Sequence, residues 1–297
     1  MTVEVVVIGS ANADVVVRVE RRPGPGETVL GSDTVLAAGG KGANAAVAAA
    51  LQEARVALLG ALGDDQHGEL LRDSMSRAGV GLDLVRTTNR PTGAAYITVT
   101  PDGENTIVVS PGANAAVDVE QVEAARRTIA DAKVLLASLE VPLPAVERAV
   151  ALAEEAGTRA VLNLSPVAKL SSQTLAALDP LVVNEHEAQW LMDGETDLNK
   201  LLELGPKSAV VTLGSKGALV IESSGTSEVS SPEVTAVDTT GAGDAFVGAL
   251  VTQLAAGDDL AAAARRAARV AAVSVTRPGA QASYPTRGEV DSVRGMV

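Results

Sequence analysis

Short runs of β-branched and other apolar residues alternate along the chain with longer stretches that are rich in alanine. The short runs have the length and composition of buried strands, and the longer stretches have those of helices. Such alternation is typical of a mostly parallel sheet with helices on both faces, so we expect an α/β fold, a three-layer α/β/α sandwich. The expected strands lie at residues 3–8, 55–59, 133–137, 159–164, 181–183, 208–212 and 218–222, and the expected helices at 42–52, 68–78, 119–130, 144–156, 242–256 and 259–275.

Two segments, residues 15–36 and 92–110, interrupt this alternation. The first is broken by Pro23-Gly24-Pro25-Gly26, and the second alternates over Ala95-Tyr96-Ile97-Thr98-Val99 and turns at Asp102-Gly103, which indicates a hairpin. Because both lie close to candidate ligand residues, we interpret them as strands of a small β-sheet lid; ordinary surface hairpins are the alternative. Without a repeat or a low-complexity linker, the chain is expected to form a single domain over residues 1–297.

The amino-acid composition disfavours several classes of partner for this chain. It carries 24 basic and 37 acidic residues, a net charge of −13, which argues against nucleic acid or an anionic membrane as the main partner. It has no cysteine, which excludes disulfides and thiolate chemistry. The first residues lack the basic region of a signal peptide, and no apolar run approaches the ~20 residues of a membrane span, so we expect a cytoplasmic protein. One Trp, two Tyr and one Phe are too few to favour a ligand bound by stacking.

The stretch from Val237 to Phe246 contains two glycines and two aspartates between a β-branched run, residues 234–237, and an apolar helix pattern. We expect a strand, a tight turn and a buried helix, in that order. Free amides in the first turn of that helix would attract an anion. Asp244 would repel a phosphate but could accept a proton beside one, although it equally suits a helix cap. The spacing fits neither a Walker loop nor a dinucleotide fingerprint.

Two further clusters follow the first expected strand. Residues 9–14 read Gly-Ser-Ala-Asn-Ala-Asp, in which Asn12 and Asp14 offer donors and acceptors for vicinal hydroxyls; a turn with Asx hydrogen bonds is the alternative. Residues 39–44 read Gly-Gly-Lys-Gly-Ala-Asn and combine close backbone approach with the cation of Lys41. A dinucleotide fingerprint formally fits this second cluster, but a broken segment of about 30 residues separates it from the first strand.

Both glycine-rich motifs resemble signatures of the ribokinase-like, or pfkB-type, carbohydrate kinase family, and they occur in that family's order. Asp238-Thr239-Thr240-Gly241-Ala242-Gly243-Asp244 resembles its C-terminal signature, and residues 39–44 match its N-terminal one. The resemblance implies that Asp244 is the catalytic base and that the amides of Gly241, Ala242 and Gly243 form an anion hole. It also implies a sugar site formed by Asn12, Ala13, Asp14, Gly39, Gly40, Lys41, Gly42, Ala43, Asn44 and Glu140, together with Asp244.

Smaller matches to the family imply a nucleotide site. By this resemblance, ATP would bind Asn184, Thr212, Leu213, Gly214, Ser215, Lys216, Gly217 and Gly243. Glu187 would hold Mg2+ that accompanies the ATP, mostly through water; its alternative role is that of a first-turn helix acid. Family members often carry Asn or His near the adenine where this chain has Ala268, so adenine binding is expected to be looser or to use other groups.

Residues 274–283 resemble the ribokinase branch of the family in particular. In that branch a loop joins the segment around Asp238 to hold a monovalent cation, typically K+, largely with backbone carbonyls, which suit a large and weakly hydrated ion. By position the ligands would be Asp238, Thr240, Ser274, Arg277, Gly279 and Ser283. The resemblance also implies that two chains pair into a homodimer through their lids.

These expectations together favour ATP-dependent phosphorylation of a small sugar, D-ribose, to D-ribose 5-phosphate. The expected sugar residues are rich in hydrogen-bonding groups and free of aromatics, which suits a polyol better than a nucleoside. Lys41 is the only Lys or Arg in the motifs near the expected sugar, which disfavours a phosphorylated hexose. The alternatives are a kinase of another small sugar or of a nucleoside, a sugar-binding protein without catalysis, and an NAD-dependent oxidoreductase.

Overall fold

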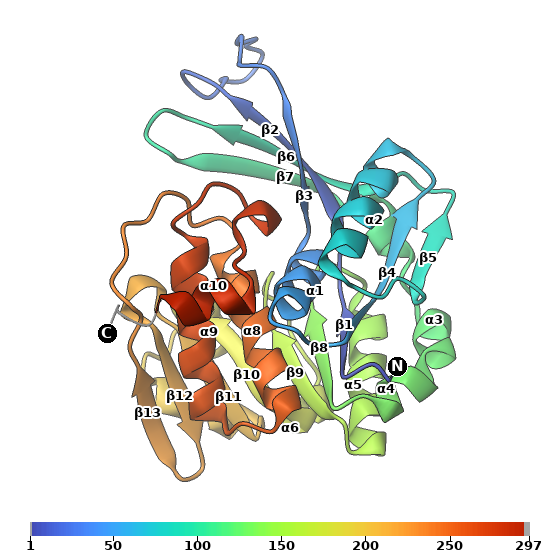
Figure 1. The fold of residues 1–297 in the computed structure, drawn as a ribbon, viewed down its shortest axis with the longest axis vertical. Helices are drawn as coiled ribbons and strands as arrows, with labels where there is room; N and C mark the ends of the chain where they lie inside the picture. Colours follow the sequence, from blue (N-terminus) through green and yellow to red (C-terminus); the bar gives the residue numbers. More distant parts are fainter. Residues whose placement is uncertain (1, 294–297) are drawn as a thin grey trace.

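The computed structural model describes residues 2–293 and shows an α/β fold with one large and one small sheet (Figure 1). The large sheet has the strand order β13-β12-β11-β10-β9-β8-β1-β4-β5. Neighbouring strands from β11 to β5 are parallel, and β12 and β13 add an antiparallel edge. Its strands are β1 (Val5–Ile8), β4 (Val56–Gly63), β5 (Val85–Thr88), β8 (Val134–Ser138), β9 (Arg159–Asn163), β10 (Leu178–Asn184), β11 (Ser208–Thr212), β12 (Ala218–Glu222) and β13 (Gly225–Val229).

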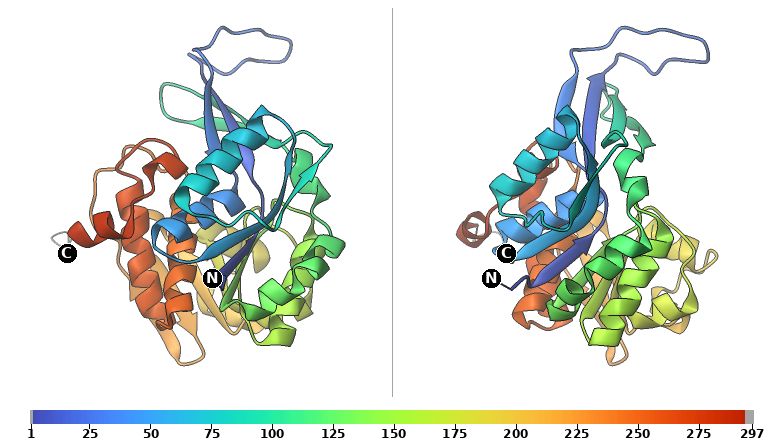
Figure 2. Two further views of the ribbon diagram at one scale, coloured as in Figure 1. Left: turned by 45° about the vertical axis from the view of Figure 1, so that its right-hand side comes forward. Right: turned by 90° about the vertical axis from the view of Figure 1, so that its right-hand side faces the viewer.

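Helices cover both faces of this sheet, as the two side views in Figure 2 show. The helices are α1 (Lys41–Leu51), α2 (Gln66–Ala78), α3 (Val119–Ala124), α4 (Arg126–Asp131), α5 (Leu143–Ala156), α6 (Ser172–Ala177), α7 (Glu185–Leu191), α8 (Ala242–Ala256), α9 (Leu260–Ser274) and α10 (Arg287–Ser292). Short 3-10 helices are η1 (Gly112–Ala116), η2 (Leu198–Leu204), η3 (Gly214–Lys216) and η4 (Gln281–Ser283). No helix among residues 2–293 is both long and apolar enough to cross a membrane.

Strand β1 lies inside the large sheet, between β8 and β4, and shows how both faces are used. All four of its residues are fully buried. Val5 and Val7 pack into one core with α1, α8 and α9, whereas Val6 and Ile8 pack into the opposite core with α3, α4 and α5. Burial of both faces requires a continuous apolar run instead of an alternating one. The expected three-layer sandwich is therefore confirmed.

Two expected elements differ in the structure. Residues 119–130, expected as one helix, form α3 and α4, which meet at Ala125 with φ −87° and ψ 0°. Residues 234–237, expected as a strand, are irregular and belong to neither sheet in the described part of the chain. A β-branched run forms a strand only where a neighbouring strand supplies the ladder. Here Val237 N instead donates to Val275 O, at the end of α9, at 2.7 Å.

The small sheet contains the two segments that were expected to form a lid, and it projects from the body at the top of Figure 1. Its strand order is β3-β2-β6-β7. Its strands are β2 (Asn12–Arg18), β3 (Val35–Gly39), β6 (Gly93–Val99) and β7 (Asn105–Ser110). The first segment of this small sheet extends beyond the expected bounds at both ends, because Asn12 and Asp14 already lie on β2 and Gly39 still lies on β3. Part of the candidate sugar site is carried by the lid itself.

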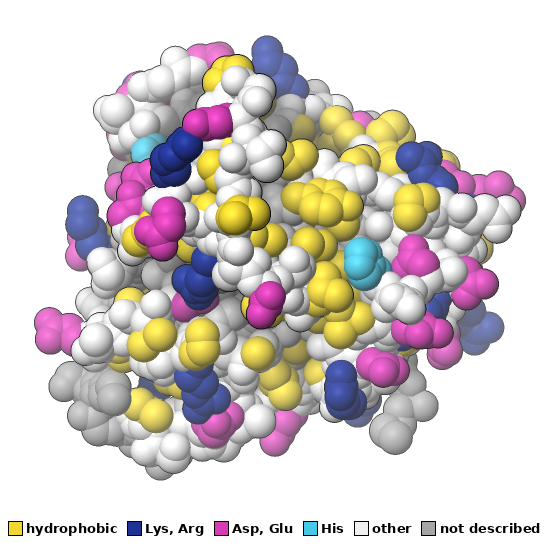
Figure 3. All heavy atoms as spheres, turned by 90° about the horizontal axis from the view of Figure 1, so that it is seen from above, with side chains coloured by type: hydrophobic (Ala, Val, Ile, Leu, Met, Phe, Trp, Pro, Cys, Tyr) yellow, Lys and Arg dark blue, Asp and Glu magenta, His cyan; other side chains and the backbone are white. Residues whose placement is uncertain are grey.

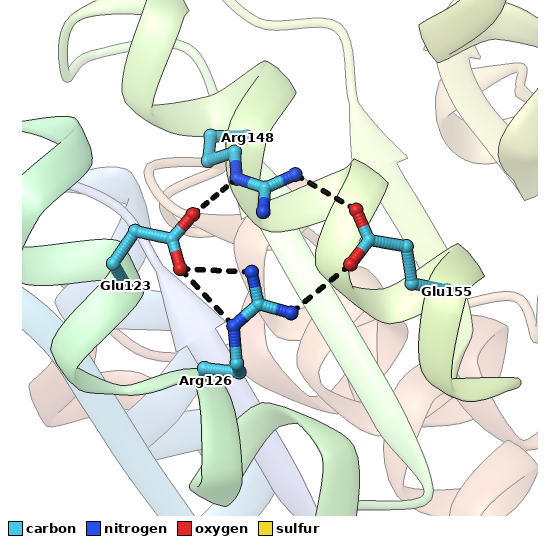
Figure 4. A network of polar contacts seen from close by, with 4 residues as sticks. All are labelled: Glu123, Arg126, Arg148 and Glu155. Carbon is cyan, nitrogen blue, oxygen red and sulfur yellow. Dashed lines mark hydrogen bonds and ion pairs between the residues drawn. The ribbon is translucent and has the colours of Figure 1, made fainter.

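A closed ring of four charged side chains ties α3, α4 and α5 together at the surface (Figure 4). Glu123 accepts hydrogen bonds from Arg148 Nε at 2.6 Å and from Arg126 Nη2 at 2.9 Å. Glu155 accepts from Arg148 Nη1 at 2.9 Å and from Arg126 Nη1 at 3.0 Å. Because the side chains are 27–51% exposed, solvent screens each pair, and the ring makes a modest contribution to this helical layer.

Candidate active site

Glycines allow the start of α1 to pack directly against the end of β1. A Cβ on Gly42 would lie 2.6 Å from the backbone carbon of Gly9, so no other residue fits without a shift. Gly40 has φ 89°, a conformation that L side chains rarely adopt. A Cβ on Gly39 would approach the Asp14 carboxylate to 2.2 Å. This packing brings the two clusters that follow the first strand into one place.

Three carboxylates from different elements interact at this place: Asp14 on β2, Glu140 after β8, and Asp244 in the first turn of α8. Burial, together with the charges of Glu140 and Asp244, raises the pKa of Asp14 to about 7. Burial also raises the pKa of Asp244, while the charge of Lys41 and a hydrogen bond from Asn44 act in the opposite direction. Such a cluster can accept hydrogen bonds from several hydroxyl groups, and one member can take a proton.

Glu140 is held by groups from two segments. Its Oε2 accepts hydrogen bonds from Ser10 Oγ at 2.5 Å, Asn12 Nδ2 at 3.4 Å and Lys41 N at 3.3 Å. Asn12 is fixed in turn by the buried Asn114, whose Nδ2 donates to Asn12 Oδ1 at 2.7 Å. Asn114 could not be identified from the sequence, because it is a single amide that lies 102 positions from Asn12 and has no motif around it.

Other candidate sugar residues contribute in different ways. Ala13 and Ala43 are fully buried, so neither residue presents an atom to a ligand in this structure. Asn44, on α1, donates its Nδ2 to Asp244 Oδ2 at 2.8 Å. The Oδ1 atom of Asn44 accepts a hydrogen bond from Gln281 Nε2 at 3.0 Å. Gln281 was not a candidate in the sequence analysis, although it lies within the segment that was assigned to a cation.

The turn before α8 presents backbone amides at the position of the expected anion site. Gly241 caps the helix with φ 73°, and Ala245 N donates to Gly241 O at 2.9 Å. The amides of residues 242–244 therefore have no hydrogen-bond acceptor within the helix, as at the start of any helix. Ala242 N donates to Thr239 O at 3.2 Å, which leaves Gly241 and Gly243 as the other two candidate donors for an anion.

A cavity of about 640 Å3 opens beside this turn. Thr212, Gly214, Ser215 and Gly217 from the expected nucleotide turn line it, and so does Gly243. Much of the remaining lining is apolar and comes from Val234, Ala236, Phe246, Ala268, Ala271, Ala272 and Val275. Leu213, Lys216 and Asn184 of the expected nucleotide set are not among its lining residues. The volume falls within the usual range of small-ligand sites.

Asp238 connects the two segments that were expected to surround a monovalent cation. Its Oδ2 accepts from Gly279 N at 2.8 Å, and its Oδ1 accepts from Thr240 N at 2.9 Å and Thr240 Oγ1 at 2.6 Å. Burial opposes the charge, but the bonds from Thr240 and Gly279 lower the pKa of Asp238 overall. Ser274 and Ser283 are buried, whereas the Arg277 side chain pairs with Glu289 at 2.7 Å. The two segments therefore lie side by side.

Asn184 and Glu187 form a capping box at the start of α7. Asn184 Oδ1 accepts from Glu187 N, and Glu187 Oε2 accepts from Asn184 N, both at 2.8 Å. Glu187 thus has the helix-start role that was its alternative. No group of three or more His, Cys, Asp or Glu side chains within residues 2–293 is arranged to hold a metal ion. The donor set therefore fits Mg2+ only if ATP and water supply most of its ligands.

Comparisons with known proteins agree with this geometry. A model described as the pfkB family carbohydrate kinase matches residues 3–287. The chain is 39% identical over 308 residues to a ribokinase of Schizosaccharomyces pombe, and the alignment covers 97% of each protein. It is 38% identical over 290 residues to a ribokinase of Bacillus subtilis, and that alignment covers 97% of this chain and 98% of the relative. The structure of Arabidopsis thaliana ribokinase complexed with ribose and ATP matches all of both chains, with a TM-score of 0.93 and 32% identity. The chain belongs to the pfkB family of carbohydrate kinases.

Proposed function

We propose that the chain is an ATP-dependent kinase that transfers the γ-phosphoryl group of ATP to the 5-hydroxyl of D-ribose. Its full-length likeness to ribokinases, one of them complexed with ribose and ATP, supports the proposal. The observation that carries it is the position of Asp244. This carboxylate accepts a hydrogen bond from Asn44, one of the candidate sugar residues. It also directly follows Gly243, which lines the large cavity of about 640 Å3. A proton acceptor thus stands between a polyol site and a nucleotide site.

The acidic cluster binds the sugar through its hydroxyl groups. Asp14 and Glu140 accept hydrogen bonds, Asn12 and Lys41 donate them, and the backbone at residues 39–42 approaches closely because of its glycines. Glu140 is already oriented by Ser10, so little side-chain freedom is lost when the sugar binds. A nucleoside would need an additional flat apolar slot on this side. The alternative substrates are therefore disfavoured, but they are included in the test below.

The chemistry requires a base, an anion site and alignment. Asp244 accepts the proton of the 5-hydroxyl as the sugar oxygen bonds to the γ-phosphorus and the bond to the ADP oxygen breaks. The amides of the 241–243 turn stabilise the negative charge of the moving group, with Gly241 and Gly243 the donors and Ala242 joining if its bond to Thr239 opens. Glu187 would hold Mg2+ through water, and the metal would supply neutralisation of the phosphate charge. The lid excludes water that would otherwise compete as acceptor.

The large cavity holds ATP with its base among the apolar side chains of α9 and its phosphates at the Thr212–Gly217 turn and the start of α8. Ala268 offers the base no side-chain hydrogen bond, so its fit depends on shape. Asn184 uses Oδ1 as a helix cap, so its Nδ2 is the group that would donate to ATP, from outside the cavity lining. Leu213 and Lys216 contribute from the rim of the turn.

Residues 238–240 and 274–283 would hold a potassium ion, which would activate the reaction by fixing the anion-site turn. The donor set fits such an ion, because the Asp238 carboxylate is occupied by Thr240 and Gly279 and leaves coordination mainly to carbonyl oxygens. Thr240, Ser274, Arg277 and Gly279 supply carbonyls, and Ser283 lies buried beside them.

Sandwich and lid act as one domain, and two copies pair through their lids. Strand register places Val15, Leu36, Tyr96 and Val108 in one row, on the face opposite to Asp14. Leu36, Tyr96 and Val108 are 52%, 52% and 64% exposed, and apolar side chains spread over the top of the molecule in Figure 3. Such a surface suits a self-complementary contact. Sedimentation should give a dimer, and Val108→Lys should give a monomer; a wild-type monomer would contradict pairing.

A coupled ATP-consumption assay with a panel of acceptors tests the function. Ribose should give the highest kcat/KM, and 2-deoxyribose a clearly lower value, because buried polar groups would be left unpaired. The product with ribose should be the 5-phosphate. A higher kcat/KM with a nucleoside or a phosphorylated hexose would overturn the substrate but keep the kinase. Reduction of NAD(P) without ATP consumption would overturn both.

A further inference from the structure

Four side chains from four separate elements form a directed chain of hydrogen bonds that ends on Asp244. Ser74 on α2 donates its hydroxyl to Gln281 Oε1 at 2.7 Å. Gln281 in η4 donates its Nε2 to Asn44 Oδ1 at 3.0 Å. Asn44 on α1 donates its Nδ2 to Asp244 Oδ2 at 2.8 Å. Ser74 and Gln281 are not used by the reaction proposed above.

The direction of this chain follows from the chemistry of its members. A carboxamide has a donor at one end and an acceptor at the other, so Asn44 can donate to Asp244 only while its oxygen faces away. The Gln281 amino group lies on that far side, and an inverted Asn44 would set two donors against each other. Ser74 donates a hydrogen bond to the carboxamide oxygen of Gln281, so the amino group of Gln281 points toward Asn44.

The orientation of Asn44 matters because Asp244 is buried. Burial raises the pKa of Asp244, and Lys41 and Asn44 work against that rise. An inverted Asn44 would present its carbonyl oxygen to the carboxylate, and the repulsion would favour the protonated form, which cannot act as a base. In the observed orientation Asn44 holds Oδ2, so the other carboxylate oxygen is left for the sugar hydroxyl.

We infer that Gln281 is a positioning residue for phosphoryl transfer: it holds the Asn44 amide in the orientation that Asp244 needs to act as the base. The inference rests on the proposed function, because Gln281 can have this role only if Asp244 takes the sugar proton. Gln281 acts through Asn44 and makes no contact with the reacting atoms. Since Gln281 follows Gly279 by two positions, the same segment that is proposed to hold a cation also controls the base.

The variant Gln281→Met removes the amide and keeps the length of the side chain at a partly exposed position. We expect kcat on ribose to fall at least about tenfold, because a misoriented Asn44 would lose its hydrogen bond to the charged Asp244. The KM for ribose should change less than about threefold, because the sugar contacts remain. The acidic limb of the kcat profile should move up by about one pH unit. Gln281→Glu, of equal size but unable to donate when ionised, should lose at least as much.

Gln52→Met is the matched control. Like Gln281, Gln52 is a glutamine whose Nε2 donates a hydrogen bond, in its case to Pro285 O at 2.8 Å, but Gln52 is fully buried. Its other partner is Arg266, at 3.1 Å, and neither contact leads to Asp244. This variant should unfold at a lower temperature but keep the wild-type acidic limb. A general loss of packing near the C-terminus is thereby separated from control of the base.

A double variant tests the route of the effect. If Gln281 acts through Asn44, adding Gln281→Met to Asn44→Ala should cost less than about a further twofold in kcat. Full additivity of the two changes, or a Gln281→Met profile equal to that of Gln52→Met, would overturn the inference. If Asp244→Asn keeps near-native turnover, the proposed base falls and the inference with it. If Asp244→Asn is inactive while Gln281→Met behaves as wild type, the inference alone falls.

Discussion

The hydroxyl of Tyr284 donates a hydrogen bond to the carbonyl oxygen of Gly241 at 3.0 Å, at the turn that opens α8. Tyr284 is buried, and a Cβ on Gly241 would approach its hydroxyl oxygen to 2.4 Å. With φ 73°, Gly241 also has a backbone conformation that other residues strain to adopt. The phenol thus fixes the turn from which the proposed anion-site amides project.

Tyr284→Phe keeps the buried ring and removes this one hydrogen bond. We expect kcat on ribose to fall about threefold to tenfold, with little change in KM, because the turn is held less firmly while the sugar contacts persist. The free energy of unfolding should fall by about 1 kcal/mol in urea titrations. Unchanged kcat in a variant of lowered stability would assign the hydroxyl a structural role alone.

Asp14 makes stability depend on pH. Burial and its acidic neighbours raise the pKa of this carboxyl from 3.8 to about 7, so between these values the folded chain binds a proton that the unfolded chain has released. The free energy of unfolding contributed by Asp14 therefore falls as the pH rises from about 4 to about 7.

Asp14→Asn removes that contribution. At about pH 8 and without sugar, the variant should unfold at a higher temperature than the wild type, and near pH 4 the difference should shrink. The same variant should raise the KM for ribose or abolish turnover, since a carboxylate acceptor is lost. If the unfolding temperature of Asp14→Asn depended on pH in the same way as that of the wild type, this account of the site would be contradicted.

The cation proposal predicts a salt effect. Replacing Na+ or Li+ by K+ at constant ionic strength should raise kcat, because the ion fixes the anion-site turn without touching the substrate. Asp238→Ala should weaken this response, since its carboxylate joins Thr240 to Gly279. Equal rates in the three salts would rule out the site. Asp118→Ala, which alters a carboxylate that caps α3 instead, controls for the lost charge.

The two glycine-rich motifs were predictable because their geometry needs consecutive residues. At Gly40 and Gly241 the backbone adopts a positive φ, and at Gly42 it touches a neighbouring segment, which only a local run of small residues permits. The fold class was predictable for a similar reason. A parallel sheet buried on both faces imposes continuous apolar runs, of which Val5–Ile8 is an example.

The residues that hold the site together could not be predicted in this way. Asn114, Ser74 and Gln281 act as single side chains, and their partners lie 102, 207 and 237 positions away in the sequence. No local pattern marks the contacts of these three residues, because tertiary packing alone brings each to its partner. The same physics explains the irregular segment at residues 234–237, whose strand-like composition meets no neighbouring strand.

The most direct test of the central claim is the steady-state kcat of Asp244→Asn with ribose and ATP. The change keeps the shape of the side chain and removes only its ability to take the proton. We expect kcat to fall at least about 100-fold, the scale of a positioned acid–base group, while the affinity for ribose changes much less. A variant that phosphorylates ribose at a near-native rate would contradict the assignment of Asp244 as the base.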